Sequence, residues 1–301
     1  MLRNEKILLT GPTSQVALPL AQQLAQDNEV YGLARLSKEE DRKKLEDVGV
    51  VPFPADMATD DYSKLPDDFS YVLNFAVIRT DDFDYDLAVN AEGLGRLLSR
   101  CRNAKAFLHS SSAAVYEPPG HRGAVESDPL GDNHRCMAPT YSIAKIAAES
   151  IAKFAALEWN LPTTIARFSV PYGDNGGWPW YHLMMMQGGA PIPVHHNAPN
   201  TYNLIHEDDY IAQVPKLLEV ASVPATVVNW ASHEQTSIEE WCAYLSELTG
   251  LEAKFESTDN ALEALPLDTR KLQGLIGDTE VHWKDGIRRM VEKRNPELLK
   301  G

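Results

Sequence analysis

Cysteine is scarce in this sequence, basic residues are outnumbered by acidic ones, and long apolar runs are missing. The three cysteines, Cys101, Cys136 and Cys242, lie far apart without paired spacing, which argues against a disulfide framework and a zinc site. The 28 Lys and Arg against 43 Asp and Glu give a formal charge of −15. Such a surface repels phosphate backbones and anionic lipids, so we expect no nucleic acid and no membrane as partner.

We expect no targeting segment. No apolar run approaches the roughly 18 residues that span a bilayer. The first residues lead into a short apolar run that stops at Gly11, unlike a signal peptide, which has a longer apolar stretch and a cleavage site. We therefore expect a cytoplasmic protein whose partner is a small-molecule substrate.

The first half of the chain alternates short apolar runs with longer amphipathic stretches. The pattern predicts strands spaced mostly by helices, which indicates a parallel sheet covered on both faces. The predicted fold class is α/β, a Rossmann-type doubly wound parallel sheet. The predicted strands are residues 6–10, 29–34, 50–53, 71–75, 106–109 and 163–168, and the predicted helices are 15–25, 38–47, 86–102 and 141–158.

Composition changes after Arg167, where residues 171–199 are rich in Gly, Pro, Trp and Met. This stretch suits a loop-and-helix cap better than another strand–helix–strand unit. We predict a dinucleotide-binding domain over 1–170 with a return segment at about 202–232. A smaller, partly interleaved substrate-binding lobe is predicted over about 171–201 and 233–301.

The turn after the first strand has features of a dinucleotide site. Such a site needs backbone amides at a helix N-terminus and small residues that let the pyrophosphate approach. Gly11 provides the tight turn, and the small residues Ser14 and Ala17 stand where two more glycines are usual. An ordinary strand–helix turn stays open as an alternative.

The end of the second predicted strand bears on the cofactor type. It has no carboxylate at its tip for the ribose hydroxyls of NAD, and Arg35 follows directly. An arginine can pair with a 2′-phosphate, so the sequence favours NADP, with NAD as the alternative. Asp56, after the third strand, is positioned to accept a hydrogen bond from adenine or to cap the chain locally.

A phenol and an ammonium share one helix face, since Tyr141 and Lys145 are four residues apart. A nearby cation stabilises a phenolate and lowers its pKa, so the pair can exchange a proton with a substrate oxygen. Ser112 follows the strand at 106–109, and ligands of open α/β sheets bind beyond such strand ends. These residues together predict carbonyl–alcohol chemistry.

With these motifs the sequence resembles the extended short-chain dehydrogenase/reductase family, also called the NAD-dependent epimerase/dehydratase family. The resemblance covers essentially the whole chain. It rests on motifs in the expected order: Thr10-Gly11 with Ser14 and Ala17, Asp56, Asn74-Phe75-Ala76, Val89-Asn90, Ser110 to Tyr116, Tyr141 to Lys145, Arg167 to Gly173, and Ile205 to Asp209.

The resemblance implies roles for individual residues. Tyr141 is the implied proton donor or acceptor, Lys145 binds the nicotinamide ribose, Ser112 holds the reacting oxygen, and Asn90 supports the helix and proton relay. The predicted cofactor contacts are Gly11, Thr13, Ser14, Gln15, Val16, Arg35, Asp56, Met57, Phe75, Ala76, Val77, Ser110, Tyr141, Lys145, Phe168 and Pro171. The predicted substrate contacts are Ser112, Ala113, Trp178, Trp180 and Tyr181.

The sequence also departs from the sugar-nucleotide members of this family. They tend to carry an arginine four residues before the position of His206, and here that residue is Tyr202. A second arginine is missing before Asp268, so a nucleotide diphosphate loses its charge-assisted clamps. The aromatic and thioether residues of the cap, Trp178 to Met186, suit an apolar substrate or simply pack the lobe.

No metal site is predicted. His195-His196 and His206 with Asp208 and Asp209 are histidine groups without a third ligand at close spacing.

Three functions remain as hypotheses. The first is an NAD(P)-dependent oxidoreductase acting on a small or apolar carbonyl or alcohol. The second is a nucleotide-sugar epimerase, with a dehydratase disfavoured because Ala113 and Ala114 stand where dehydratases tend to place Asp and Glu. The third is a non-catalytic cofactor sensor. Relatives commonly dimerise through the helices that hold Asn90 and Tyr141, so a homodimer is expected.

Overall fold

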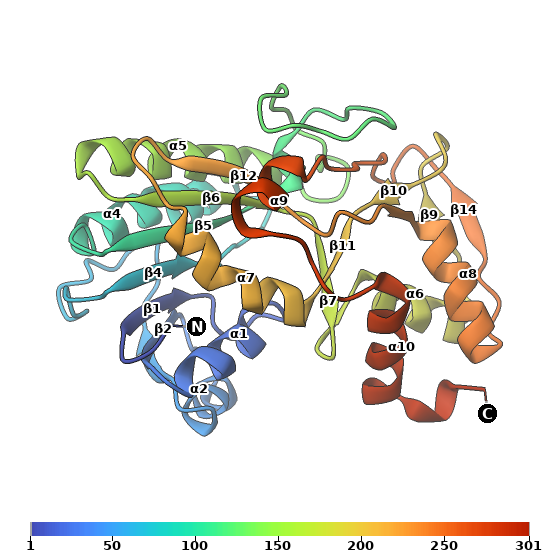
Figure 1. Cartoon of the computed structure of the whole chain (residues 1–301), viewed down its shortest axis with the longest axis horizontal. Coiled ribbons are helices and arrows are strands. Elements are labelled where there is room, and N and C mark those ends of the chain that lie inside the picture. Colours follow the sequence, from blue (N-terminus) through green and yellow to red (C-terminus); the bar gives the residue numbers. More distant parts are fainter. Residues whose placement is uncertain (1, 301) are drawn as a thin grey trace.

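A seven-stranded parallel sheet forms the centre of the molecule (Figure 1). The computed structural model describes residues 2–300; Met1 and Gly301, at the outer ends of the predicted domain ranges, lie outside the described residues. The strand order β12-β6-β5-β4-β1-β2-β3 places the first strand inside the sheet, with the chain winding outward in both directions. The predicted fold class is confirmed. The strands are β1 (Lys6–Thr10), β2 (Glu29–Ala34), β3 (Val51–Pro54), β4 (Tyr71–Asn74), β5 (Ala106–Ser112), β6 (Thr163–Phe168) and β12 (Thr226–Trp230).

Two layers of helices cover the sheet because successive strand residues face opposite sides. Ile7 and Leu9 join the core under α1 (Ala17–Ala25), α7 (Glu207–Glu219) and α9 (Arg270–Ile276). Leu8, between them, joins the core under α4 (Gly93–Arg100) and α5 (Tyr141–Glu158). The central strands are buried on both faces, which explains why they are nearly continuous apolar runs in the sequence.

The helix predicted over residues 86–102 is three segments in the structure. Asp82 accepts a hydrogen bond from the backbone N–H of Tyr85 and starts α3 (Phe83–Leu87) earlier than predicted. The π-helical segment η1 (Ala88–Glu92) follows, and then α4. Gly93 lies so close to the chain at Met57 that an added Cβ would be 2.1 Å from the Met57 carbonyl oxygen. This close approach, which no local pattern signals, fixes the path of the helix.

A smaller lobe beside the sheet is built around its own core, which includes Leu183, Trp241 and Met290. Residues from α9 are an exception, because Leu272 and Ile276 pack in the core of the large sheet although they follow position 233. The lobe's helices are α6 (Trp178–Gln187), α8 (Ile238–Thr249) and α10 (Trp283–Arg294), with the 3₁₀ segment η3 (Pro296–Leu298) after them. Its strands are β7 (Val170–Gly173), β8 (Gly176–Gly177), β9 (Ile192–Val194), β10 (Thr201–Tyr202), β11 (Leu204–His206), β13 (Thr236–Ser237) and β14 (Phe255–Ser257).

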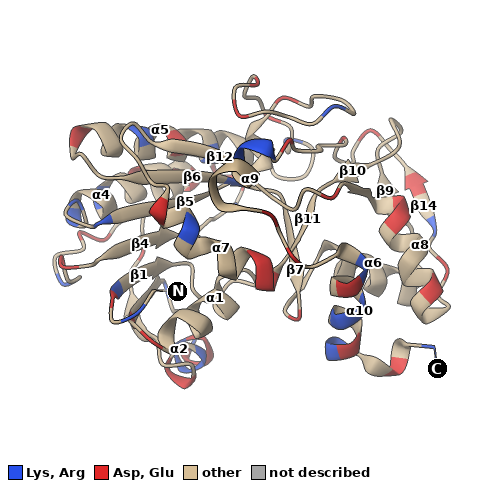
Figure 2. Ribbon diagram, in the orientation of Figure 1, with Lys and Arg blue, Asp and Glu red and all other residues tan. Residues whose placement is uncertain are grey.

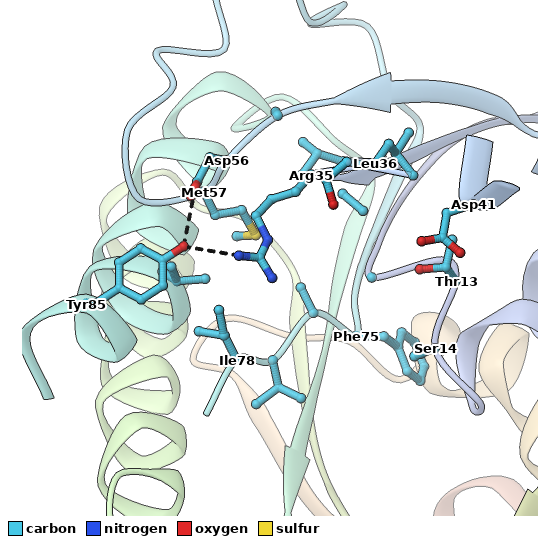
Figure 3. Close-up of a pocket in the computed structure, with 18 residues that line it drawn as sticks. Thr13, Ser14, Arg35, Leu36, Asp41, Asp56, Met57, Phe75, Ile78 and Tyr85 are labelled. Atoms are coloured by element: carbon cyan, nitrogen blue, oxygen red, sulfur yellow. Dashed lines mark hydrogen bonds between the residues drawn. The ribbon is translucent and has the colours of Figure 1, made fainter. Parts of the chain in front are cut away.

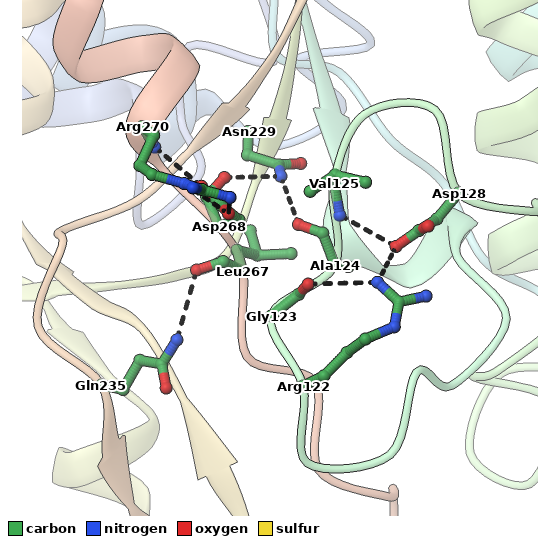
Figure 4. A network of polar contacts seen from close by, with 10 residues as sticks. All are labelled: Arg122, Gly123, Ala124, Val125, Asp128, Asn229, Gln235, Leu267, Asp268 and Arg270. Atoms are coloured by element: carbon green, nitrogen blue, oxygen red, sulfur yellow. Dashed lines mark hydrogen bonds and ion pairs between the residues drawn. The ribbon is translucent and has the colours of Figure 1, made fainter.

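A polar network joins the sheet to the lobe (Figure 4). Asn229, on β12, donates through its side-chain amide to the carbonyls of Ala124 and Asp268, at 2.8 and 3.0 Å. The backbone of Ala124 also pairs with that of Pro266 and Asp268. The strand edge, the loop before α5 and the segment before α9 are therefore held together, and this segment leads into the wall of the cavity described below.

Charged residues lie mainly on outer helix faces and loops, and both signs occur on α2 (Glu39–Asp47) and α10 (Figure 2). None of the helices within residues 2–300 is both long and apolar enough to cross a bilayer. On α5, Phe154 and Leu157 are exposed in the single chain. The homodimer expected through this helix stays a prediction.

Candidate functional site

Three cavities follow one another along the carboxyl ends of the central strands. We name them the first, middle and lobe cavities, with volumes of about 290, 370 and 420 Å³. The first and middle cavities share Ser14, Phe75 and Val77. The middle and lobe cavities share Ser112 and Tyr141. A long ligand can therefore lie across the strand ends with one tip at Tyr141.

All the predicted cofactor contacts line this groove. The first cavity is lined by Gly11, Thr13, Ser14, Arg35, Asp56, Met57, Phe75, Ala76 and Val77, together with residues such as Asp41 and Tyr85. The middle cavity is lined by Ser14, Gln15, Val16, Phe75, Val77, Ser110, Tyr141, Lys145, Phe168 and Pro171, among others. The donor set and the elongated shape fit a dinucleotide whose pyrophosphate lies at the start of α1.

Gly11 is required at the first turn for two reasons. Its φ of +66° lies in the left-handed region that side chains disfavour. An added Cβ would also lie 2.9 Å from the backbone of Ala76. Thr10 ties the same two segments together, since its hydroxyl accepts from the backbone N–H groups of Phe75 and Ala76.

Arg35 reaches across the first cavity toward Tyr85 (Figure 3). Its guanidinium donates to the Tyr85 hydroxyl at 3.5 Å, and that hydroxyl donates to the Asp56 carboxylate at 3.3 Å. Asp56 also accepts from the backbone N–H of Ala58, so it caps the chain locally. Asp41 lines the same cavity. The first cavity thus contains two carboxylates as well as the guanidinium.

Tyr141 and Ser112 lie together where the middle and lobe cavities meet. Burial raises the pKa of the Tyr141 hydroxyl, while a hydrogen bond with Ser112 and the charge of Arg79 oppose that rise. The net direction differs from the lowered pKa expected from the sequence. Burial outweighs the two opposing effects, and the Lys145 Nζ donates to the Ser110 carbonyl, at 2.7 Å, and not to the phenol.

Lys145 is almost completely buried, with 4% of its surface exposed. Burial lowers its pKa to about 8, and the Glu149 carboxylate partly opposes this. Glu149 lies one helical turn further and forms a bidentate ion pair with Arg167, with N···O distances of 2.9 and 2.8 Å. Ser111 donates to the same carboxylate at 2.6 Å. Arg167 belongs to a family motif in the sequence, but the motif does not predict this buried pair with Glu149.

Asn90 lies behind the groove and lines none of the three cavities. Its side-chain oxygen accepts from the Ile78 N–H at 2.9 Å, and its NH₂ donates to the Ile78 carbonyl at 2.8 Å. Both ends of the amide are therefore occupied by one loop residue, inside the π-helical segment η1. Asn90 therefore positions the loop at Ile78. Its predicted role in a proton relay stays a prediction.

The lobe cavity has a mostly apolar and aromatic lining. Of the predicted substrate contacts, Ser112, Ala113, Trp178 and Tyr181 line it. Trp180 does not, because it lies on another face of α6 with the Arg294 guanidinium 4.5 Å from its ring centroid. Tyr202 also lines the cavity, and its hydroxyl donates to the carbonyls of Leu262 and Glu263.

Several lining residues were missed by sequence reasoning. Arg79, His134 and Met137 line the lobe cavity from loops that carry no recognisable motif, as do Leu262 and Leu265. His134 lies beside Tyr141, with ring centroids 5.4 Å apart, and its Nδ1 bonds the Asn133 side-chain oxygen. Burial lowers the pKa of His134 to about 4. It is therefore neutral at pH 7, with Nε2 as the remaining acceptor.

The structure adds a third group to one histidine pair. His196 Nδ1 lies 2.6 Å from an Asp259 carboxylate oxygen, and candidate ligand atoms of His195, His196 and Asp259 lie within 4.8 Å of one another. His196 and Asp259 are exposed, which an ordinary surface ion pair explains. The absence of a metal site stays a prediction.

Comparison with known proteins identifies the family. Residues 7–230 match the NAD dependent epimerase/dehydratase family, which is most of the chain. The human and bovine dTDP-D-glucose 4,6-dehydratases (Homo sapiens and Bos taurus) are each 22% identical to it, over 96% of this chain. The alignments cover 89% and 88% of those two proteins.

Solved structures share the whole fold. The UDP-N-acetylglucosamine 4-epimerase of Methanobrevibacter ruminantium, in complex with UDP-N-acetylmuramic acid, superposes with a TM-score of 0.84 at 16% identity, covering 98% of this chain and 100% of that one. The UDP-glucuronic acid 4-epimerase of Bacillus cereus, in complex with UDP-glucuronic acid and NAD, has a TM-score of 0.81 at 21% identity, covering 96% and 98%. At these identities the likeness establishes the fold.

Proposed function

The chain belongs to the NAD dependent epimerase/dehydratase family, and from this premise we propose that it is an NAD-dependent epimerase of a nucleotide-sugar substrate. The observation that carries the proposal is the meeting of Tyr141 and Ser112 at the junction of two cavities. One cavity continues toward the dinucleotide turn, and the other is closed by the lobe. The names of the relatives favour this reading over net oxidation or reduction of a small alcohol.

The proposed reaction removes and restores one hydrogen at a secondary alcohol carbon. NAD, when bound, accepts the hydride at nicotinamide C4 and returns it. Ser112 holds the alcohol oxygen, and Tyr141, which must be a phenolate for this step, takes the hydroxyl proton as the ketone forms. The positive charges of Arg79 and Lys145 favour the phenolate against the effect of burial. The ketone then presents its other face, the hydride returns, and Tyr141 gives the proton back. Lys145 keeps its positive charge beside the site throughout. Tyr141 takes one proton and returns one proton, so no net proton is gained or lost.

Epimerisation fits this chain better than dehydration. Dehydration needs a further acid and base to remove water, and the two residues after Ser112 are Ala113 and Ala114, which cannot exchange protons. The dehydratase relatives are only 22% identical, so their activity does not transfer directly.

A second function remains favoured by one observation. Tyr202 stands in the lobe cavity at the position of the family's arginine, and its hydroxyl is already bonded to two carbonyls. A site without that cation binds a diphosphate less well. An NAD(P)-dependent oxidoreductase of a small or apolar alcohol is therefore the alternative proposal.

A ligand screen separates these two functions. UDP-, GDP- and dTDP-sugars are added to the NAD-loaded protein, and thermal unfolding is recorded, because a ligand that binds the native state raises Tm. Sugars that raise Tm are then incubated with the protein, and their epimers are sought by NMR. A nucleotide sugar that raises Tm and is epimerised supports the proposal. Failure of every nucleotide sugar, with turnover of simple alcohols, supports the alternative.

The cofactor is proposed to be NAD, although the sequence favoured NADP. Structures of relatives contain NAD, and Asp41 and Asp56 line the first cavity, where they disfavour a further phosphate. Parallel calorimetric titrations with NAD and NADP test this, using wild type and Arg35→Ala. We expect tighter binding of NAD, little changed by the substitution. Tighter binding of NADP that is lost in Arg35→Ala would restore the original hypothesis.

A further inference from the structure

Arg79 is a guanidinium without a partner at the reaction centre. It lines both the middle and the lobe cavities, and within residues 2–300 it forms no hydrogen bond or ion pair. It is also the only side chain with a permanent charge among the described residues that line the lobe cavity. In a chain with a formal charge of −15, an unpaired arginine at this place needs an explanation.

The backbone on both sides of Arg79 is held by buried polar side chains. Asn90 bonds both the N–H and the carbonyl of Ile78, at 2.9 and 2.8 Å. Asp86 accepts from the N–H and the hydroxyl of Thr80, both at 2.8 Å. Asp86 and Asn90 are 0% and 6% exposed. Burying an amide and a carboxylate is costly unless they are fully bonded, so this loop is positioned firmly.

The same carboxylate connects the loop to the catalytic helix. Asp86 accepts from the Thr140 hydroxyl at 2.6 Å, and Thr140 directly precedes Tyr141. The positive charge of Arg79 also lowers the pKa of both Tyr141 and His134. At Tyr141 this opposes the effect of burial, and at His134 it adds to the effect of burial. The backbone that carries Arg79 is therefore held in place relative to the start of the helix with Tyr141, while the guanidinium stays free to bind a ligand.

We propose that Arg79 binds a carboxylate on the reacting part of the substrate, which makes this enzyme selective for acidic substrates. The inference deepens the proposed function, since it assumes that the reacting alcohol lies at Tyr141. A guanidinium pairs with a carboxylate through two parallel hydrogen bonds. The remaining lining, which includes Trp178, Tyr181 and Leu265, offers apolar contacts to the rest of the ligand and no second cation.

Matched acid and neutral ligands test the proposal. The NAD-loaded protein is titrated calorimetrically with UDP-glucuronic acid and UDP-glucose, and with 3-phenylpropionate and 3-phenylpropanol. In wild type we expect each acid to bind at least about 10-fold more tightly than its neutral partner, as one well-formed charge-assisted pair implies. Arg79→Gln should remove that preference, and Arg79→Lys should retain part of it.

Two controls make the result specific. Arg135→Gln removes a neighbouring exposed arginine that does not line the cavity and should leave both preferences intact. NAD affinity and Tm of Arg79→Gln should stay close to wild type, because the side chain is exposed and unbonded.

Three results would overturn the proposal: wild type binds acid and neutral ligands equally or binds none of them, Arg79→Gln keeps the preference, or Arg79→Gln loses NAD affinity. The last result would place Arg79 on the cofactor phosphates. A different result separates the two proposals. If neither UDP ligand binds but 3-phenylpropionate is preferred and the preference depends on Arg79, the nucleotide-sugar function is wrong and the carboxylate site at Arg79 is supported.

Discussion

At the residue scale, Lys145 shows how the site trades stability for chemistry. Burial lowers its pKa from 10.5 to about 8, so keeping the ammonium charged in the fold lowers the free energy of unfolding. This lowering corresponds to about 3 kcal/mol at neutral pH. The ammonium also donates to the Ser110 carbonyl, and a variant without it leaves that buried carbonyl without this bond, which is worth about 1 kcal/mol. A residue kept at such a cost is kept for a function.

Replacing Lys145 by Met should therefore raise the free energy of unfolding at pH 7, by about 2 kcal/mol, while abolishing turnover. The sign follows from proton binding. Between pH 8 and 10.5 the unfolded state holds the Lys145 proton and the folded state has lost it, so wild type gains stability as pH rises. The difference in the free energy of unfolding between Lys145→Met and wild type should therefore shrink from pH 8 to pH 10.5. Urea unfolding at pH 7, 9 and 10 measures it, and a variant that is less stable at every pH would refute the argument.

At the element scale, the sequence predicts those strands and helices whose pattern of apolar residues lies in consecutive positions. β1, β2, α5 and β6 lie where the apolar runs and helical periodicity place them, because central strands and one amphipathic helix are encoded in consecutive residues. The division of the helix around Asn90 was missed, and the close approach of Gly93 to Met57 beside it joins residues far apart in the sequence, which no local pattern signals. Arg79 and His134 were missed for a similar reason, because loops bring them to Tyr141 only in three dimensions.

The start of α8 offers a test of a locally encoded element. Ser237 accepts from the Glu240 N–H, and the Glu240 carboxylate accepts from the Ser237 N–H, which is a complete capping box. Ser237→Ala should lower the free energy of unfolding by about 1 kcal/mol. Ser246→Ala, in the last turn of the same helix, removes only a bond to the Cys242 carbonyl and serves as control. Equal stability of the two variants in urea unfolding would contradict the role of the cap.

At the scale of the whole molecule, one buried and two half-buried histidines make the fold sensitive to acid. Burial lowers the pKa of His109 to about 3, and those of His134 and His182 to about 4. His109 is bonded to Asn74 beneath the cofactor turn, and His182 accepts from the Trp241 indole within the lobe. Both parts of the molecule therefore depend on neutral imidazoles.

The free energy of unfolding should fall as pH drops from 6.5 to 5. In this range the unfolded histidines bind protons and the folded ones do not, so protonation favours the unfolded state. His109→Gln should reduce the slope of stability against pH, whereas His121→Gln, at an exposed position, should leave it unchanged. Urea unfolding at several pH values gives both slopes, and identical slopes for the two variants would contradict this account.

The central claim is that hydride leaves and returns to the same substrate carbon beside Tyr141. It is tested most directly with UDP-glucose and UDP-glucuronic acid deuterated at C4, the position at which the similar solved 4-epimerases are named to act. The sugars are incubated with the protein and NAD and analysed by mass spectrometry and NMR. The account predicts a C4 epimer that retains the deuterium, no accumulation of reduced cofactor, and no product with Tyr141→Phe. Deuterium in released reduced cofactor, turnover by Tyr141→Phe, or no turnover of either sugar would contradict it.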